Sequence, residues 1–166
     1  MKRYSRLLII MIAMAVLAGC SSEMLSPEDQ TIAYLENIRD GKLEAAYNSL
    51  SSGSVKIKTF EQFEQENANQ LYRYFKDIIT FELIDVSAND SSAMVGIKRT
   101  YPDLSGFLPD MMGRPLAEYV QDADAAKELY EKLSKKQQGE PFPTASVDQT
   151  FYLNKESSGW KIRLDK

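Results

Sequence analysis

The segment VDQTFYLNKESSGWKIRL (residues 147–164) contains the pattern that decides the fold. It holds two runs in which apolar side chains recur at every second position, as in strands with one buried face. The alternating residues, apolar except for Gln149, are Val147, Gln149, Phe151 and Leu153 in the first run and Trp160, Ile162 and Leu164 in the second. Residues 154–159 between the runs are polar and end in glycine, which is typical of a turn. The segment therefore predicts a β-hairpin at the end of the domain.

The same alternation occurs farther upstream. Ile79, Phe81 and Leu83 alternate with polar residues, and after a turn at 89–92 a second strand carries Val95, Ile97, Arg99 and Tyr101 on one face. Residues 103–143 separate this pair of strands from the C-terminal hairpin. Within them Pro115 is placed to open a helix with an apolar side that runs through residues 116–133.

Three helices are predicted before the strands. The first begins at Ser26 and ends at Asp40-Gly41, and a short second helix follows at 43–50. We expect the serine-rich segment 51–54 to break the second helix, and a third helix with an aromatic face to cover 59–75. Because helices and strands are segregated, the sequence predicts a single α+β domain over residues 26–166, with a mostly antiparallel sheet of about four strands.

Three features together resemble the nuclear transport factor 2-like superfamily, also called the cystatin-like α+β roll. They are the Asp40-Gly41 exit with Ala46-Tyr47 in the second helix, the aromatic third helix, and the closing FYLNKE (151–156) and GWKI (159–162). The chain looks most similar to small bacterial lipoproteins of unknown function that carry this domain. The resemblance implies N-terminal helices packed on a curved sheet and a cone that often holds a ligand. It also implies an open sheet face that often forms dimers.

The first residues have the form of an export signal. Lys2, Arg3 and Arg6 precede an apolar run at 7–17, which is too short for a stable spanning helix. The following Leu17-Ala18-Gly19-Cys20 is similar to the lipobox of bacterial lipoproteins. We therefore expect residues 1–19 to be a removed signal peptide, Cys20 to carry lipid, and residues 20–25 to form a tether.

This anchor predicts a place in the cell envelope. Several acyl chains on one cysteine hold a protein firmly to a membrane, whereas a single chain does not. The residue after the cysteine is Ser21 and not aspartate, which favours the periplasmic face of the outer membrane in a Gram-negative host. In a Gram-positive host, the expected place is the outer face of the cell membrane.

The composition argues against several classes of function. The chain has no histidine and one cysteine, so it lacks Ser–His and Cys–His nucleophile pairs and a His/Cys zinc site. We expect no metal and no cofactor. Removal of the leader takes three of the 20 basic residues and changes the formal net charge from −4 to −7. Because such a surface repels phosphates at long range, nucleic-acid binding is not expected.

The expected function is non-catalytic binding of a small ligand or a protein partner, through the cone or the sheet face. The residues predicted to line a pocket or form a lid are Tyr34, Phe63, Tyr101, Phe107, Met111 and Tyr152. The simpler interpretation of such aromatic stripes is that they fill the core. One alternative is an isomerase or dehydratase that uses Tyr101 with Asp85 or Asp103, and another is a structural spacer.

Overall fold

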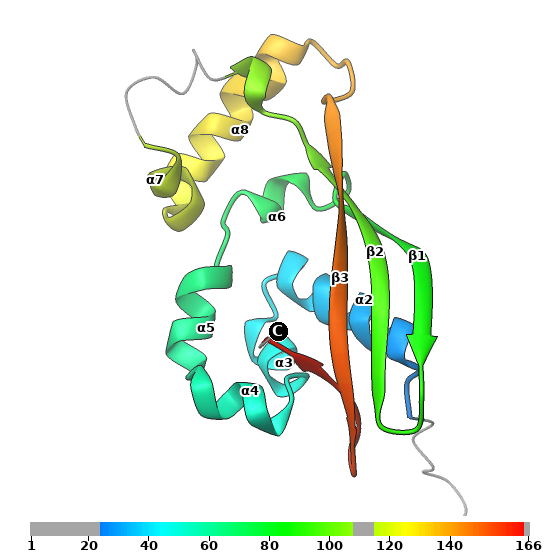
Figure 1. Ribbon diagram of the computed structural model, residues 1–166. Coiled ribbons are helices and arrows are strands. Elements are labelled where there is room, and N and C mark those ends of the chain that lie inside the picture. The colour runs from blue at the N-terminus through cyan, green and yellow to red at the C-terminus, as the bar shows by residue number, and fades with distance from the viewer. Residues whose placement is uncertain (1–23, 108–114, 165–166) are drawn as a thin grey trace, which may run out of the picture.

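The computed structural model describes residues 24–107 and 115–164. The four strands form one sheet in the order β1-β2-β3-β4, and each strand is antiparallel to its neighbours (Figure 1). Their bounds are Thr80–Ala88 for β1, Ser92–Pro102 for β2, Thr144–Glu156 for β3 and Gly159–Arg163 for β4. The predicted α+β fold, with helices packed on a curved antiparallel sheet, is confirmed.

The register of the sheet explains which side chains are buried. Val95 pairs with Phe151 and Ile97 pairs with Gln149, so these residues share the face that the helices cover. In β1 the register shifts between Leu83 and Asp85, which indicates a β-bulge. The bulge interrupts the predicted alternation, and Leu83 is 43% exposed.

The N-terminal helices begin and end much as their caps predict. The first helix, α2, spans Pro27–Arg39; Ser26 accepts a hydrogen bond from the backbone of Asp29, and Gly41 takes a φ of 71°. The next helix, α3, spans Leu43–Asn48. The second helix ends before the serine-rich segment, as predicted, but Ser51 caps a further helix that was not predicted, α4, over Ser52–Ile57. The backbone of Ser51 also donates to Ile162 O, which ties this link to β4.

The predicted helix over 59–75 is divided in the structure. Its first part, α5, spans Phe60–Asn67 and opens with a capping box formed by Thr59 and Gln62. Its second part, α6, spans only Tyr72–Phe75. Between them the Asn69 side chain accepts a hydrogen bond from Leu71 N, and Gln70 N donates to Val120 O. A turn and a long-range contact thus replace helical hydrogen bonds here.

The predicted helix over 116–133 is also divided. Asp122 ends α7, which spans Leu116–Gln121, and its carboxylate caps α8, which spans Ala123–Gln137. Figure 1 shows α7 and α8 at the end of the molecule opposite α3–α5.

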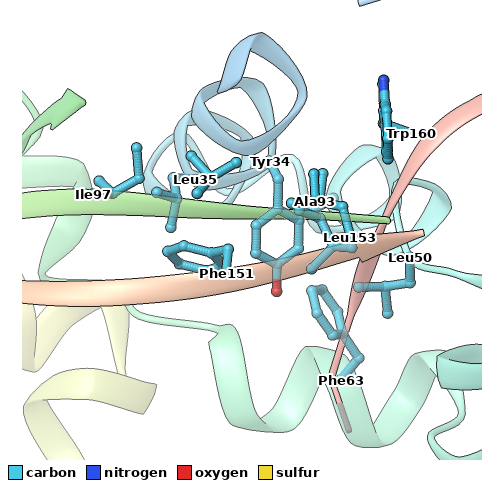
Figure 2. Packing of buried hydrophobic residues seen from close by; sticks show 12 residues of the cluster. Tyr34, Leu35, Leu50, Phe63, Ala93, Ile97, Phe151, Leu153 and Trp160 are labelled. Carbon is cyan, nitrogen blue, oxygen red and sulfur yellow. The ribbon is translucent and has the colours of Figure 1, made fainter. Parts of the chain in front are cut away.

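Two hydrophobic cores lie on the covered side of the sheet. The first joins α2, α3 and α5 to β2, β3 and β4, and Figure 2 shows Tyr34 and Leu35 of α2 together with Phe151 and Leu153. The second core joins α6, α7 and α8, with Phe75 and Leu133 almost fully buried. The fold therefore has two packed ends, and the site considered next lies between them.

Candidate functional site

A cavity of about 270 Å³ lies between the two cores. It is called the cleft below. Its lining comes from α2, from the end of α5, from α6 and the link before it, from the inner faces of β1, β2 and β3, and from α7. The lining residues are Tyr34, Leu35, Ile38, Arg39, Glu66, Asn67, Ala68, Asn69, Tyr72, Ile79, Phe81, Arg99, Val120, Gln149 and Phe151. The cleft thus has a mixed lining, in which aromatic and aliphatic side chains alternate with charged and amide groups that could orient a small ligand.

Tyr34 separates the cleft from the first core. Its ring contacts Phe63 at 6.4 Å and Phe151 at 6.3 Å between ring centroids (Figure 2). Burial raises the pKa of Tyr34 to about 12, and the negative charge of Glu66 adds to the effect. Within residues 24–107 and 115–164 the hydroxyl has no hydrogen-bond partner. Tyr34 therefore presents a neutral hydroxyl to the cleft at physiological pH.

Arg99 is the basic residue on the inner face of β2. It pairs with Phe81 of β1, which also lines the cleft. One terminal nitrogen of its guanidinium, Nη2, donates to the Tyr72 hydroxyl. The guanidinium carbon lies 5.4 Å from the centroid of the Tyr72 ring and 6.0 Å from that of Tyr101. The Nε atom is buried and has no hydrogen-bond partner among the described residues.

The other charged groups of the cleft have partners outside it. Arg39 forms ion pairs with Asp40 at 2.9 Å and with Glu36 at 3.7 Å. Glu66 pairs with Lys58, and its side chain is 56% exposed. Both groups therefore have a counter-charge, whereas Arg99 has no carboxylate within ion-pair distance in the part of the chain that the structure describes.

Of the predicted pocket or lid residues that the structure describes, only Tyr34 lines the cleft; Tyr34 and Tyr152 both line a separate hollow of about 220 Å³ beside β4. Tyr34 lines the cleft, and Phe63 lies behind it in the first core, 1% exposed. Tyr101 borders the second core, and Phe107 is buried in that core, with its ring centroid 6.2 Å from that of Phe142. Tyr152 lies on the opposite face of the sheet and is 38% exposed, because it alternates with the inward residues Phe151 and Leu153.

Two further predicted residues cannot be placed. Met111 and the lipid-attachment residue Cys20 lie outside the described residues.

The main polar residues of the cleft were not among those predicted. Arg99 and Tyr72 are the clearest cases, and Arg99 had a signal in the sequence. It follows Val95 and Ile97 on the buried face of a strand, where a charged residue requires a partner or a function. Tyr72 carried no comparable signal, because the break between α5 and α6 decides where it points.

The carboxylates of the alternative enzyme hypothesis lie away from the cleft. Asp85 is exposed and approaches Gly96, where an added Cβ would lie 2.1 Å from its Oδ1 atom. Asp103 accepts hydrogen bonds from Ser105, and these lower its pKa. It is therefore a turn-forming residue, and neither carboxylate lines the cleft.

Comparisons with known proteins give little beyond the fold. No protein-family model matches the sequence, and no curated protein is similar to it. One similar solved structure is a Campylobacter jejuni protein described as a candidate nuclear transport factor 2-like transpeptidase. The two chains are 12% identical with a TM-score of 0.48, over 85% of this chain and 100% of the other. At this level of similarity, the activity named for that protein is not transferred to this chain.

Two other classes of site were sought in residues 24–107 and 115–164. These residues contain no group of three or more His, Cys, Asp or Glu side chains placed to hold a metal ion. None of their helices combines the length and the apolar character needed to cross a bilayer.

Proposed function

We propose that residues 26–166 are the ligand-binding domain of an envelope lipoprotein anchored through Cys20, and that a small ligand binds in the cleft without being chemically changed. The observation that carries this proposal is the cleft itself. The cleft, of about 270 Å³ and partly open to solvent, brings aromatic rings and polar side chains from several elements to one place between two filled cores, an arrangement that suits a small organic molecule.

The position of the cleft supports the proposal. Tyr34 of α2, Phe81 of β1 and Phe151 of β3 belong to different elements that the two cores hold in place. A site on such rigid elements requires little rearrangement when a ligand binds. The aromatic rings offer flat apolar surface, while the hydroxyl of Tyr34 can donate a hydrogen bond.

Ligand binding in the cleft can be tested with three small aromatic probes: benzamide, benzoate and phenyl phosphate. Each is titrated into the full-length protein, and binding is followed by NMR chemical-shift changes. Ala68 lines the cleft, so Ala68→Phe is expected to fill it and weaken binding of every probe that binds the wild type. Ala117 is exposed on α7, and Ala117→Phe is the matched control that should bind normally.

Two results would contradict a ligand site in the cleft. The first is that none of the three probes shows saturable binding to the wild type. The second is that Ala68→Phe binds the probes as tightly as Ala117→Phe does.

The lipid anchor is tested separately. Cys20→Ser removes the thiol that would be acylated, so the variant is expected to leave the membrane fraction when cells are fractionated. Mass spectrometry of the wild type should show an acylated cysteine at the new amino terminus. A variant that stays in the membrane fraction, or a wild type that keeps its leader, would contradict the anchor.

The other hypotheses stay predictions. An isomerase or dehydratase would use a buried carboxyl beside the ligand, but Glu66, which lines the cleft, is half exposed and paired with Lys58. A homodimer through the open sheet face would bury Ile84, Met94 and Tyr152, which are exposed there.

A further inference from the structure

We infer that the ligand of the cleft carries an oxyanion, a carboxylate or a phosphate, and that Arg99 binds it. This inference rests on the proposed function, because it names the chemical class of the ligand that the same cleft would hold.

The first argument is the unsatisfied hydrogen bonding of Arg99. A guanidinium has five N–H donors, which suit the paired oxygens of a carboxylate or a phosphate. Among the described residues, the Tyr72 hydroxyl accepts from Nη2, and Nε is buried without a partner. A neutral hydroxyl does not balance the charge of the guanidinium. Arg99 therefore lines the cleft with a charge that no described group balances and with a guanidinium that is not fully hydrogen-bonded.

The second argument is the absence of a counter-charge. A partly buried cation loses hydration, and this cost is normally offset by a nearby carboxylate. The chain has 24 acidic residues against 20 basic ones, yet no acidic residue in the described ranges forms an ion pair with Arg99. Arg39, in the same cleft, has Asp40 and Glu36 as partners. Asp40 supplies a negative charge to Arg39, and a ligand oxyanion would supply the corresponding negative charge to Arg99.

The third argument is how Arg99 is held. The rings of Tyr72 and Tyr101 lie 5.4 Å and 6.0 Å from its guanidinium carbon, and they restrict the side chain. Gln149 lies diagonally across from Arg99, because it pairs with Ile97, two residues before Arg99 on β2. Gln149 also lines the cleft, so its amide can add a hydrogen bond to the same oxyanion.

The apolar lining predicts the rest of the ligand. Ile79, Phe81 and Phe151 line the same cavity, and the charge of Glu66, the acidic residue of the lining, is balanced by Lys58. The expected ligand is therefore a small molecule with an oxyanion at one end and an apolar body. The part of the ligand that lies inside the cleft is limited to what about 270 Å³ can hold.

The test uses the same probes, because benzoate and benzamide have nearly the same shape but differ in charge. We expect the full-length wild type to bind benzoate or phenyl phosphate at least about ten-fold more tightly than benzamide. The anion that binds more tightly distinguishes a carboxylate ligand from a phosphate ligand. Arg99→Gln should abolish this preference, and Arg99→Lys should recover only part of it, because lysine keeps the charge but not the planar fork.

The matched control is Lys98→Gln. Lys98 is adjacent to Arg99 on β2 but projects from the opposite face and is exposed, so this variant removes the same charge away from the cleft. It should keep the preference for anions. The NMR spectrum of each variant reports whether it is folded, and the wild-type comparison of benzoate with benzamide does not depend on any variant.

The possible results separate the inference from the proposed function. If benzamide binds as tightly as both anions, or if folded Arg99→Gln keeps the preference, the oxyanion inference is wrong while the ligand site stands. If no probe binds, both are wrong. An anion preference that is lost in Arg99→Gln and kept in Lys98→Gln supports both.

Discussion

Raising the pH above about 10 is expected to destabilise the fold through Tyr34. The pKa of this tyrosine is raised from 10.0 to about 12, mainly by burial and secondarily by the charge of Glu66. In the unfolded chain the hydroxyl ionises at its ordinary pKa, so between these two values the unfolded state loses the proton while the folded state keeps it. The stabilisation is therefore fully present below the ordinary pKa and is lost as the pH rises toward about 12.

The size of the effect follows from the shift. Each unit of pKa difference corresponds to about 1.4 kcal/mol, so the whole shift corresponds to about 3 kcal/mol. Between about pH 9 and about pH 11 the expected loss is about 1.3 kcal/mol. Part of this loss should persist in Glu66→Gln, because burial is the larger cause. A loss of this size is a substantial fraction of a typical domain stability of about 5–15 kcal/mol.

The assay is urea unfolding of the wild type and of Tyr34→Phe at both pH values. The phenylalanine variant has nothing to ionise at position 34, while the other eight of the nine tyrosines are unchanged. The wild type should lose about 1.3 kcal/mol more than the variant. Equal losses in the two proteins would refute the reasoning, because they would show that Tyr34 does not ionise later than an exposed tyrosine.

Three further predictions concern stability and can be checked by the same unfolding measurements. Phe63→Ala should lower the free energy of unfolding by about 3–5 kcal/mol, because Phe63 is almost fully buried. Phe60 lies on the same helix but is only partly buried, so Phe60→Ala should lower it clearly less. Equal losses in the two variants would contradict this account of the first core. Asp122→Ala should cost about 1 kcal/mol, because the carboxylate accepts a hydrogen bond from the backbone of Ala125, and an unchanged midpoint would show that α8 needs no cap. Gln138→Gly should stabilise the protein by up to about 1 kcal/mol, because Gln138 has a φ of 52°, and a loss of stability would contradict this.

The sequence by itself determined the class of fold. The alternation at 147–164 and at 95–101 predicted strands, and Ser26, Thr59 and Gly41 predicted helix ends that the structure confirms. These features depend on local physics, namely a strand period of two and the hydrogen-bonding needs of helix ends, so they can be recognised without knowing the fold. The anchor at Cys20 likewise depends on a local motif, and it stays a prediction.

Tertiary structure alone decided where the helices break and which residues meet. The chain leaves helical geometry at residues 68–71 because Gln70 donates to Val120, which is 50 residues away, and no local pattern contains that contact. The division of the helical residues into two cores, with the cleft between them, follows from such contacts. Tyr34, Tyr72 and Arg99 are far apart in the sequence, and they line one cavity because α2, α6 and β2 meet there. Side-chain periodicity assigns a residue to a face, but only the packing of the elements decides whether that face is filled or left open.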